Sequence, residues 1–189
     1  MDHVPAVVEA WEPGCKGGQA VAEILFGLVN PSGKLPITIP RSVGQIQTVY
    51  NYLPSQYSRK YVLGQTGPLF WFGHGLSYTT FKYENLRLPA KVSPGENVTV
   101  TVDVTNTGQR AGDEVVLAYV HDVVSSTTTP VKSLQAFKRI SLAPGEKHTV
   151  ELTIAYDQLA LINAEMKRVV EPGEFEIYVG DLKGAFTAL

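Results

Sequence analysis

Two glutamates on a predicted strand have a spacing that would suit acid–base chemistry. Glu174 and Glu176 are two residues apart in an alternating segment, so their side chains would share one face, roughly 7 Å apart. That separation falls within the ~6.5–9.5 Å between the two carboxylates of an inverting glycosidase. The apolar residues Phe175, Ile177 and Val179 would occupy the other face. The pattern therefore favours a solvated strand surface over an active site.

The other acids and the histidines give weaker signals. Asp113 and Glu114 are neighbours, so on a strand they would point to opposite faces and could not act together. His74 lies between Gly73 and Gly75, which would let the backbone approach another surface closely. We expect a structural, hydrogen-bonding role for His74 rather than a catalytic one. The histidines, at positions 3, 74, 121 and 148, have no metal-ligand spacing, and no metal site is predicted.

A glycine-rich segment precedes a predicted helix. Residues 14–19, GCKGGQ, superficially resemble a phosphate-binding loop, but the G-K-[ST] ending is absent and a nucleotide site is disfavoured. Cys15 is the only cysteine, which excludes an internal disulfide and a cysteine-based zinc site. Because no histidine partner can be identified, its thiol is interpreted as inert.

The composition is that of an ordinary globular protein of one to two domains. The 189 residues are 44% hydrophobic and 18% charged, and the net charge of −2 gives no reason to expect nucleic acid or an anionic membrane as a partner. No apolar run approaches the ~18 residues of a membrane span. Residues 1–11 lack the basic and apolar regions of a signal peptide. We expect them to belong to the interior of a folded domain.

The first forty residues have the pattern of a single βα unit. Val4–Trp11 suits the end of a buried strand, and an apolar stripe over residues 19–26 predicts a short helix. Residues 30–33, NPSG, predict a turn, and residues 35–40 predict an edge strand or extended cover because two prolines lack an N–H donor. This block is too small for a core of its own, so we interpret it as the last portion of a larger α/β domain.

Residues 41–80 have little periodicity but many aromatic side chains. Ten of the eighteen aromatic residues lie between Tyr50 and Tyr83. A structureless segment of this length is unusual in a compact domain unless it is pinned down or functional. We expect this aromatic-rich linker loop to join the two parts of the chain.

From Phe81 the pattern changes to period two. Val98, Val100, Val102 and Val104 would face one way and the polar residues between them the other. Further strands are predicted over residues 114–121, 131–140, 150–154, 175–179 and 185–189, with a hairpin over 161–170. This spacing predicts a mainly β fold, an antiparallel β-sandwich of the immunoglobulin type. The absence of the Cys…Trp…Cys pattern favours a fibronectin type III-like variant.

A set of specific motifs runs through nearly the whole chain. They are VPAVVEAW at 4–11, PG at 13–14, GG at 17–18, LFG at 25–27, NPSGKLP at 30–36, FGHGLSYT at 72–79, NTG at 106–108, AGDEVV at 111–116, LAPGE at 142–146 and VEPG at 170–173. In this order they resemble the closing segment of glycoside hydrolase family 3, and the resemblance implies β-glucosidase-like or β-xylosidase-like relatives.

The resemblance implies a barrel domain, an α/β sandwich domain and a C-terminal fibronectin type III-like domain. It also implies retaining chemistry, with an aspartate nucleophile in the barrel and usually a glutamate acid/base in the α/β sandwich. Neither motif has a counterpart here, so no catalytic residue is assigned to this chain. The expected domains are residues 1–40 (the terminal fragment of the α/β sandwich domain), 41–80 (the linker loop) and 81–189 (the fibronectin type III-like β-sandwich).

The resemblance also implies roles for aromatic residues and partners. Trp71, Phe72 and Tyr78 are expected to be buried at a domain interface, and Trp11 and His74 are candidate substrate-binding residues. The expected partners are the barrel and α/β domains, in cis or as a separate chain, and a β-linked glucoside or xyloside acted on by the whole enzyme. No cofactor is expected. The location of that enzyme is left open, with a periplasmic or secreted bacterial protein favoured and a cytoplasmic one possible.

A second hypothesis is a stand-alone carbohydrate- or protein-binding sandwich module. Four tyrosines of the linker loop, Tyr50, Tyr52, Tyr57 and Tyr61, could stack on sugar rings. The same side chains could equally form an apolar interface with the rest of an enzyme.

Overall fold

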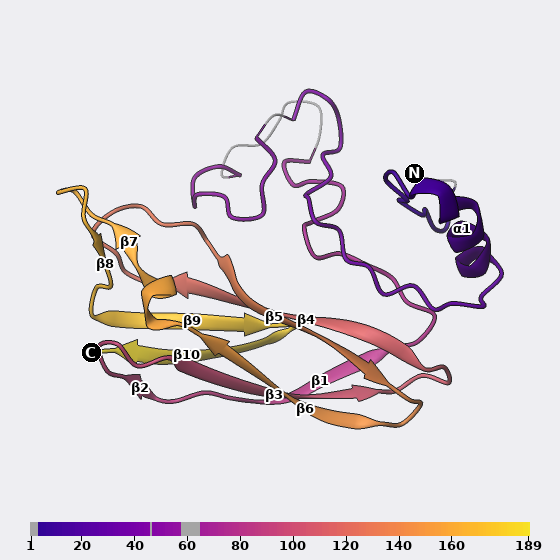
Figure 1. The fold of residues 1–189 in the computed structure, drawn as a ribbon. Helices are drawn as coiled ribbons and strands as arrows, with labels where there is room; N and C mark the ends of the chain where they lie inside the picture. Colours follow the sequence, from indigo (N-terminus) through magenta and orange to yellow (C-terminus); the bar gives the residue numbers. More distant parts are fainter. Residues whose placement is uncertain (1–3, 46, 58–64) are drawn as a thin grey trace.

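The chain folds into a β-sandwich with an N-terminal segment, residues 4–40, laid along one side of it (Figure 1). This computed structural model describes residues 4–45, 47–57 and 65–189. The segment carries the 3-10 helix η1 (Gly14–Lys16) and the helix α1 (Gly17–Leu25). In residues 4–45, 47–57 and 65–189, the structure contains no helix with the length and apolar character of a membrane span.

Two sheets, antiparallel except at one pair of strands, form the sandwich that the sequence predicts. The smaller sheet has the order β1-β3-β6 and the larger has the order β2-β10-β9-β4-β5, in which β2 and β10 pair in parallel. The strands are β1 (Phe81–Arg87), β2 (Lys91–Val92), β3 (Val98–Asn106), β4 (Gly112–Asp122), β5 (Ser133–Leu142), β6 (Lys147–Ile154), β9 (Gly173–Val179) and β10 (Leu182–Ala188). The 3-10 helix η2 (Tyr156–Leu159) precedes a hairpin of β7 (Leu161–Ile162) and β8 (Arg168–Val169), where a hairpin is predicted.

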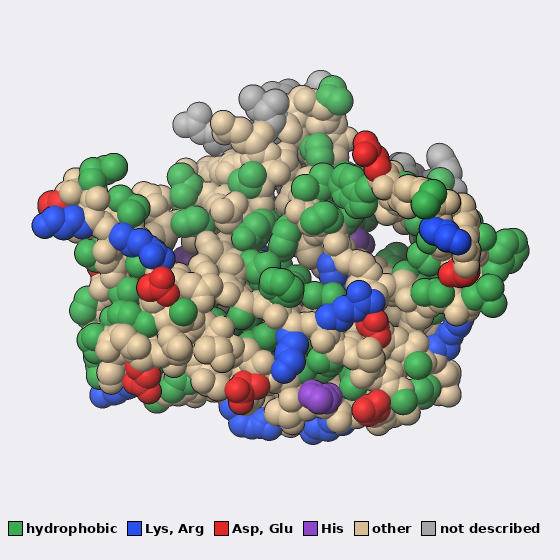
Figure 2. All heavy atoms as spheres, viewed as in Figure 1, with side chains coloured by type: hydrophobic (Ala, Val, Ile, Leu, Met, Phe, Trp, Pro, Cys, Tyr) green, Lys and Arg blue, Asp and Glu red, His purple; other side chains and the backbone are tan. Residues whose placement is uncertain are grey.

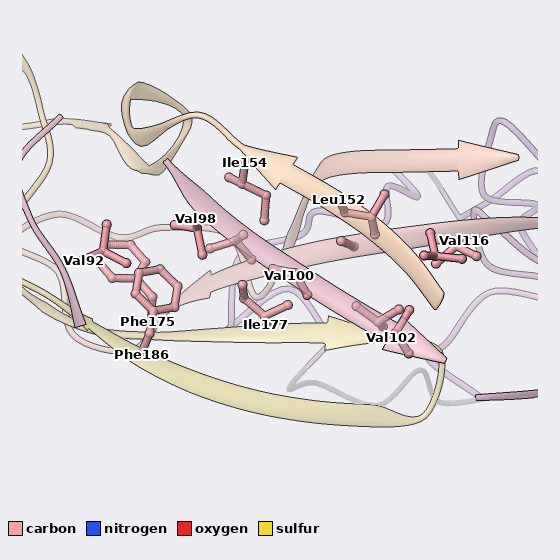
Figure 3. Close-up of a cluster of buried hydrophobic side chains, with 14 of the residues drawn as sticks. Val92, Val98, Val100, Val102, Val116, Leu152, Ile154, Phe175, Ile177 and Phe186 are labelled. Carbon is pink, nitrogen blue, oxygen red and sulfur yellow. The ribbon is translucent and has the colours of Figure 1, made fainter. Parts of the chain in front are cut away.

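The core lies between the two sheets and follows the predicted alternation. Val98, Val100, Val102 and Val104 of β3 are all fully buried. The first three are labelled in Figure 3, where they point toward the other sheet. From the larger sheet, Phe175 and Phe186 contribute stacked rings whose centroids are 5.5 Å apart. Burying so many apolar side chains in one contiguous cluster supplies the main driving force for the sandwich.

The N-terminal segment differs from the sequence prediction in two places. Val4–Trp11 forms no strand and is largely exposed, because a buried strand needs paired neighbours and no described sheet reaches it. Residues 30–33 do not form a turn, and the Asn30 side chain makes contacts far along the chain instead. The helix itself is confirmed, ending where Gly27 takes φ +71° and donates its N–H to the Ile24 carbonyl.

A carboxylate is buried on the outer face of the smaller sheet. Asp103 of β3 accepts hydrogen bonds from Asn85 (2.8 Å) and Thr149 (2.7 Å) and pairs with Lys147 (2.9 Å) and Arg87 (3.2 Å). Asn85 reaches it because the β1 register is irregular there and Asn85 takes φ +53°. The hydrogen bonds from Asn85, Lys147 and Thr149 hold the pKa of Asp103 well below its usual range.

The variant Asp103→Asn tests this network through its pH dependence. Because the folded-state pKa is depressed, the ionised carboxylate stabilises the fold above the unfolded pKa of about 3.9, and this contribution is lost as the pH falls through the lower folded value. We expect the urea midpoint of Asp103→Asn to lie below that of the wild type at pH 7, and the gap to be smaller at pH 2, where the pH has fallen well below the unfolded pKa toward the folded value. Asp157→Asn, at an exposed ion pair, is the control, and an equal Asp103→Asn gap at both pH values would contradict the prediction.

Candidate functional site: the interface between the N-terminal segment and the sandwich

The two glutamates of β9 lie on the outer face of the larger sheet. Glu176 lies on the outer face of the strand, paired with Lys183 at 2.6 Å and hydrogen-bonded by the Tyr178 hydroxyl, while Glu174 is exposed. The Lys183 ammonium is the first cause that holds the pKa of Glu176 below its usual range. A carboxyl that stays ionised beside a lysine is a poor proton donor. Both glutamates lie on the outer face, as the alternation predicts, but only Glu174 is solvated, because the Glu176 side chain is 16% exposed.

The neighbouring acids of β4 point to opposite faces, as expected. Asp113 lies on the outer face, where Ser141 and Arg139 donate to it and lower the pKa of its carboxyl. Glu114 points inward and is buried. The two carboxylates therefore do not form a catalytic pair.

Glu114 joins three parts of the chain. Its carboxylate accepts a hydrogen bond from the Tyr83 hydroxyl of β1 at 2.8 Å and pairs with Lys34 Nζ of the N-terminal segment at 3.1 Å. The Glu114 side chain is 9% exposed and that of Lys34 is 21% exposed, so little water competes for the pair. Burial, together with the Glu114 charge, raises the pKa of Tyr83, which keeps its hydroxyl protonated as a donor.

A second polar anchor is the carboxamide of Asn30. Its Nδ2 donates to the Ala111 carbonyl at 3.0 Å, and its Oδ1 accepts from the Ser77 hydroxyl and the Tyr78 N–H at 2.9 and 2.8 Å. One side chain thus connects the N-terminal segment, the linker loop and the start of β4. Two further bonds, from Arg139 to Ser32 and from Arg110 to the Gly27 carbonyl, reinforce this side.

Glycines on either side of His74 allow close backbone contact. A Cβ on Gly73, which has φ +82°, would lie 2.9 Å from the Leu117 and Tyr119 side chains of β4. A Cβ on Gly75 would lie 2.4 Å from the Gly33 carbonyl oxygen. The linker loop can therefore lie directly on the larger sheet and on the N-terminal segment only with glycine at both positions.

An aromatic cluster fills the space between the linker loop and β4. The Tyr50 ring stacks on Phe72 at 4.4 Å and meets Tyr119 edge-on at 5.9 Å. The Leu134 N–H donates to the Tyr50 hydroxyl at 3.2 Å, and the Lys132 ammonium lies 4.8 Å from the Tyr119 ring centroid. Burial raises the pKa of Tyr119 to about 12. Such ring pairs stabilise beyond the area they bury, by ~0.5–1.5 kcal/mol each.

The predicted interface residues occupy two different places. Phe72 is half-buried in the aromatic cluster, and Trp71 stacks on Tyr52 while keeping 39% of its surface exposed. Tyr78 lies apart from them, donating its hydroxyl to the Ile24 carbonyl of α1 at 2.7 Å beneath the Arg110 guanidinium. The rings of Trp71 and Phe72 thus pack on other rings of the linker loop, whereas the Tyr78 side chain contacts α1 and Arg110 outside it. The role of the three residues in a larger interface stays a prediction.

The candidate substrate-binding residues are not brought together with one another. Trp11 is 55% exposed at φ +48°, and its N–H donates to Glu9. The His74 ring stacks on Phe70 at 4.9 Å, and in the described part of the chain its imidazole makes no hydrogen bond. The backbone of His74, in contrast, accepts from the Leu35 N–H at 2.8 Å. A binding role for either residue stays untested.

Sequence reasoning missed the residues that hold the segment in place. Lys34 and Glu114 are 80 residues apart, and Asn30 and Ala111 are 81 residues apart, so no local pattern connects them. Across residues 4–45, 47–57 and 65–189, no group of three or more His, Cys, Asp or Glu side chains is arranged to hold a metal ion. Tyr61 and His3 lie outside the described residues.

The fold and this interface define a fibronectin type III-like sandwich with the end of a second domain docked on it. Residues 1–78 match the model of the glycosyl hydrolase family 3 C-terminal domain, and residues 114–183 match that of the fibronectin type III-like domain. The chain therefore belongs to glycoside hydrolase family 3, of which it carries C-terminal domain sequence followed by the fibronectin type III-like domain.

Relatives share this segment along nearly its whole length. The chain is 44% identical to a periplasmic β-glucosidase of Salmonella typhimurium and 44% identical to a β-xylosidase of Formosa agariphila. These matches cover 93% and 95% of this chain but only 24% and 25% of the relatives. The solved β-glucosidase EmGH1 of Erythrobacter marinus superposes with a TM-score of 0.95 at 40% identity, over 100% of this chain and 26% of that structure. The chain spans about a quarter of the proteins it matches.

The variant Lys34→Met tests the attachment of the N-terminal segment. It would leave the buried Glu114 carboxylate with Tyr83 as its remaining partner, at a cost of about 2 kcal/mol in unfolding free energy. We also expect faster hydrogen exchange at the Leu35 and Gly73 amides, which pair across the segment and the linker loop. Lys82→Met, at an exposed ion pair, is the matched control. Unchanged exchange at Leu35 and Gly73 would rule out an anchoring role.

The variant Phe72→Ala tests the aromatic cluster. Removing a ring stacked on Tyr50 should cost about 3 kcal/mol, at the lower end of the range for buried aromatic residues. Trp71→Ala and Tyr78→Ala should cost less, because these side chains are more exposed. Phe137→Ala is the control, since its ring is 69% exposed on β5. A cooperative melt unchanged in both Phe72→Ala and Trp71→Ala would contradict the interface role.

Proposed function

We propose that this chain is the non-catalytic C-terminal part of a retaining β-glycosidase of the β-glucosidase or β-xylosidase type. In this proposal residues 1–40 complete an α/β domain, residues 41–80 connect it, and residues 81–189 form the sandwich. The sandwich stabilises the catalytic domains by holding the end of the α/β domain in place. The reacting carboxylates belong to the part of the relatives that this chain does not match, and the substrate is a β-linked glucoside or xyloside.

One observation carries this proposal: several large apolar side chains of the N-terminal segment are exposed to solvent. Leu25, Phe26 and Leu28, at the end of α1 and just after it, are 62%, 83% and 77% exposed. Apolar side chains gather around this helix on the surface, at the right in Figure 2. An exposed apolar patch of this kind is typical of an interface, and the remaining three quarters of the relatives' length would supply a partner for it.

The relatives also bear on sugar specificity. A named β-glucosidase and a named β-xylosidase are equally similar to this chain, at 44% identity each. A segment under selection to choose between glucose and xylose would be expected to resemble one class more than the other. We therefore place the choice of sugar outside this segment.

A stand-alone sugar-binding module is the competing function, favoured by the exposed Trp71 ring. The other rings are less suited to it. Tyr50 is stacked between Phe72 and Tyr119, and Tyr52 and Tyr57 pack against each other at 4.6 Å. A sugar platform needs open ring faces, so this arrangement supports an interface rather than a binding surface.

Activity measurements distinguish the two functions. The chain alone should not hydrolyse aryl β-glucosides or aryl β-xylosides, and it should form a stable, active complex with the barrel and α/β part of a family 3 enzyme produced separately. Phe26→Ser should weaken that complex more than Phe137→Ser, because Phe26 lies on the proposed contact surface and Phe137 on the sandwich. Turnover by the chain alone would overturn the proposal. Retention on insoluble glucan that is lost in Trp71→Ala would favour the binding module.

A further inference from the structure

One tripeptide of the sandwich has the sequence at which asparagine is N-glycosylated. Asn97-Val98-Thr99 fits Asn-X-Ser/Thr, in which X is any residue except proline. No other asparagine of the chain has this context, because Asn30, which comes nearest, is followed by Pro31. Such tripeptides also occur by chance, so the geometry of the side chain decides whether this one is usable.

Asn97 lies on the surface, where a polar turn leads into β3. In this turn the Glu96 N–H donates to the Ser93 carbonyl at 2.9 Å, the Ser93 N–H donates to the Glu96 carboxylate at 3.0 Å, and Gly95 takes φ +82°. Asn97 itself is exposed. Glycosylated asparagines lie in surface loops of this kind, because the attached sugar is bulky and hydrated.

The carboxamide of Asn97 uses its oxygen in the fold and leaves its nitrogen available. Oδ1 accepts a hydrogen bond from the Tyr156 N–H at 3.2 Å, whereas Nδ2 donates to no group in the described part of the chain. A glycan is attached to Nδ2 and replaces one of its two hydrogens, so the bond to Tyr156 remains after the transfer. The folded sandwich therefore accepts a sugar at this atom without losing a contact.

The site is far from the surface that the N-terminal segment occupies. Asn97 directly precedes β3, and Asn106 ends that strand, where its side chain bonds to Thr79 and to the carbonyl of Arg110, which in turn bonds to the N-terminal segment. The nine residues of β3, at about 3.3 Å each, separate the two asparagines by roughly 30 Å. In Figure 1 the start of β3 lies on the side of the C-terminus, and α1 lies on the opposite side. A glycan on Asn97 would thus leave the docking of the segment undisturbed.

Folding closes the tripeptide to an enzyme. Val98 is fully buried, Thr99 is aligned with Thr153 of β6, and β3 is the central strand of its sheet. An oligosaccharyltransferase reads both the asparagine and the hydroxyl residue two positions later, so it needs this stretch free of its neighbours. The transfer must therefore precede the pairing of β3 with β6.

We propose that Asn97 is an acceptor of N-linked glycosylation and receives an oligosaccharide from a lipid pyrophosphate donor before the sandwich folds. Nδ2 attacks C1 of the first sugar and forms the new C–N bond, while the bond between C1 and the pyrophosphate oxygen breaks. The electron pair of that bond leaves with the lipid pyrophosphate, and one Nδ2 proton passes to a base of the enzyme. This inference does not rest on the proposed glycosidase role, because no residue of the tripeptide belongs to the interface with the N-terminal segment.

The test is translation of the 189-residue chain behind a cleavable signal peptide in the presence of microsomes, which supply the oligosaccharyltransferase and the donor. We expect one electrophoretic shift that peptide N-glycosidase reverses. Asn97→Gln and Thr99→Ala should each abolish the shift, and Thr99→Ser should retain it because serine keeps the hydroxyl. The matched control, Asn51→Gln, alters an exposed asparagine outside the recognised context and should be modified as the wild type is.

A second measurement tests the order of transfer and folding. The chain is purified unmodified and folded, then incubated with oligosaccharyltransferase and lipid-linked oligosaccharide, and its intact mass should not change. Absence of the shift during translation, while a known glycoprotein is modified in the same reaction, would overturn the acceptor assignment, as would a shift that persists in Asn97→Gln. Equal modification of the folded chain would overturn the order. The shift during translation is read without refolding, so it decides the question even if Asn97→Gln does not fold.

Discussion

The attachment of the N-terminal segment depends on a single buried carboxylate. Glu114 points into the protein from β4, where an uncompensated charge would be costly. Lys34 supplies the positive charge and Tyr83 supplies a second donor, so the segment, β1 and β4 must all be in place for the pair to form. The segment has no core of its own, and this requirement fixes where it can lie on the sandwich.

Besides this pair, two kinds of contact hold the N-terminal segment and the linker loop on the sandwich. The first kind is polar. The backbone of Leu35 exchanges hydrogen bonds with that of Gly73 and His74, and the Asn30 side chain bonds to the Ala111 carbonyl. These bonds pair backbone groups that no sheet pairs. The stacked rings of Tyr50 and Phe72 bury apolar surface against β4. The glycines at 73 and 75 allow both, because any side chain there would keep the backbone away from its neighbours.

How far the sequence predicts this structure depends on the range of the interactions involved. The alternation of Val98 to Val104 is local, and the strand it predicts is present with every valine buried. Val4–Trp11 is similarly apolar, yet a strand also needs neighbours, which local pattern does not supply. The Lys34–Glu114 pair spans 80 residues and could not be inferred from spacing. The family resemblance predicts that Phe72 lies at an interface, but it does not predict that its ring stacks on Tyr50, because that contact depends on the tertiary fold.

The separation between Lys34 and Glu114 also affects how the protein is made. Synthesis proceeds from the N-terminus at ~5–20 residues per second, so Lys34 is made roughly 4–16 s before its partner. The β4 strand must then pair with β5 and β9, which come later still, before the docking face exists. For that period the apolar end of α1 has no sandwich to hold the segment in place. A nascent chain in this state is a natural substrate for chaperones and proteases, and faster completion of the sandwich shortens its exposure.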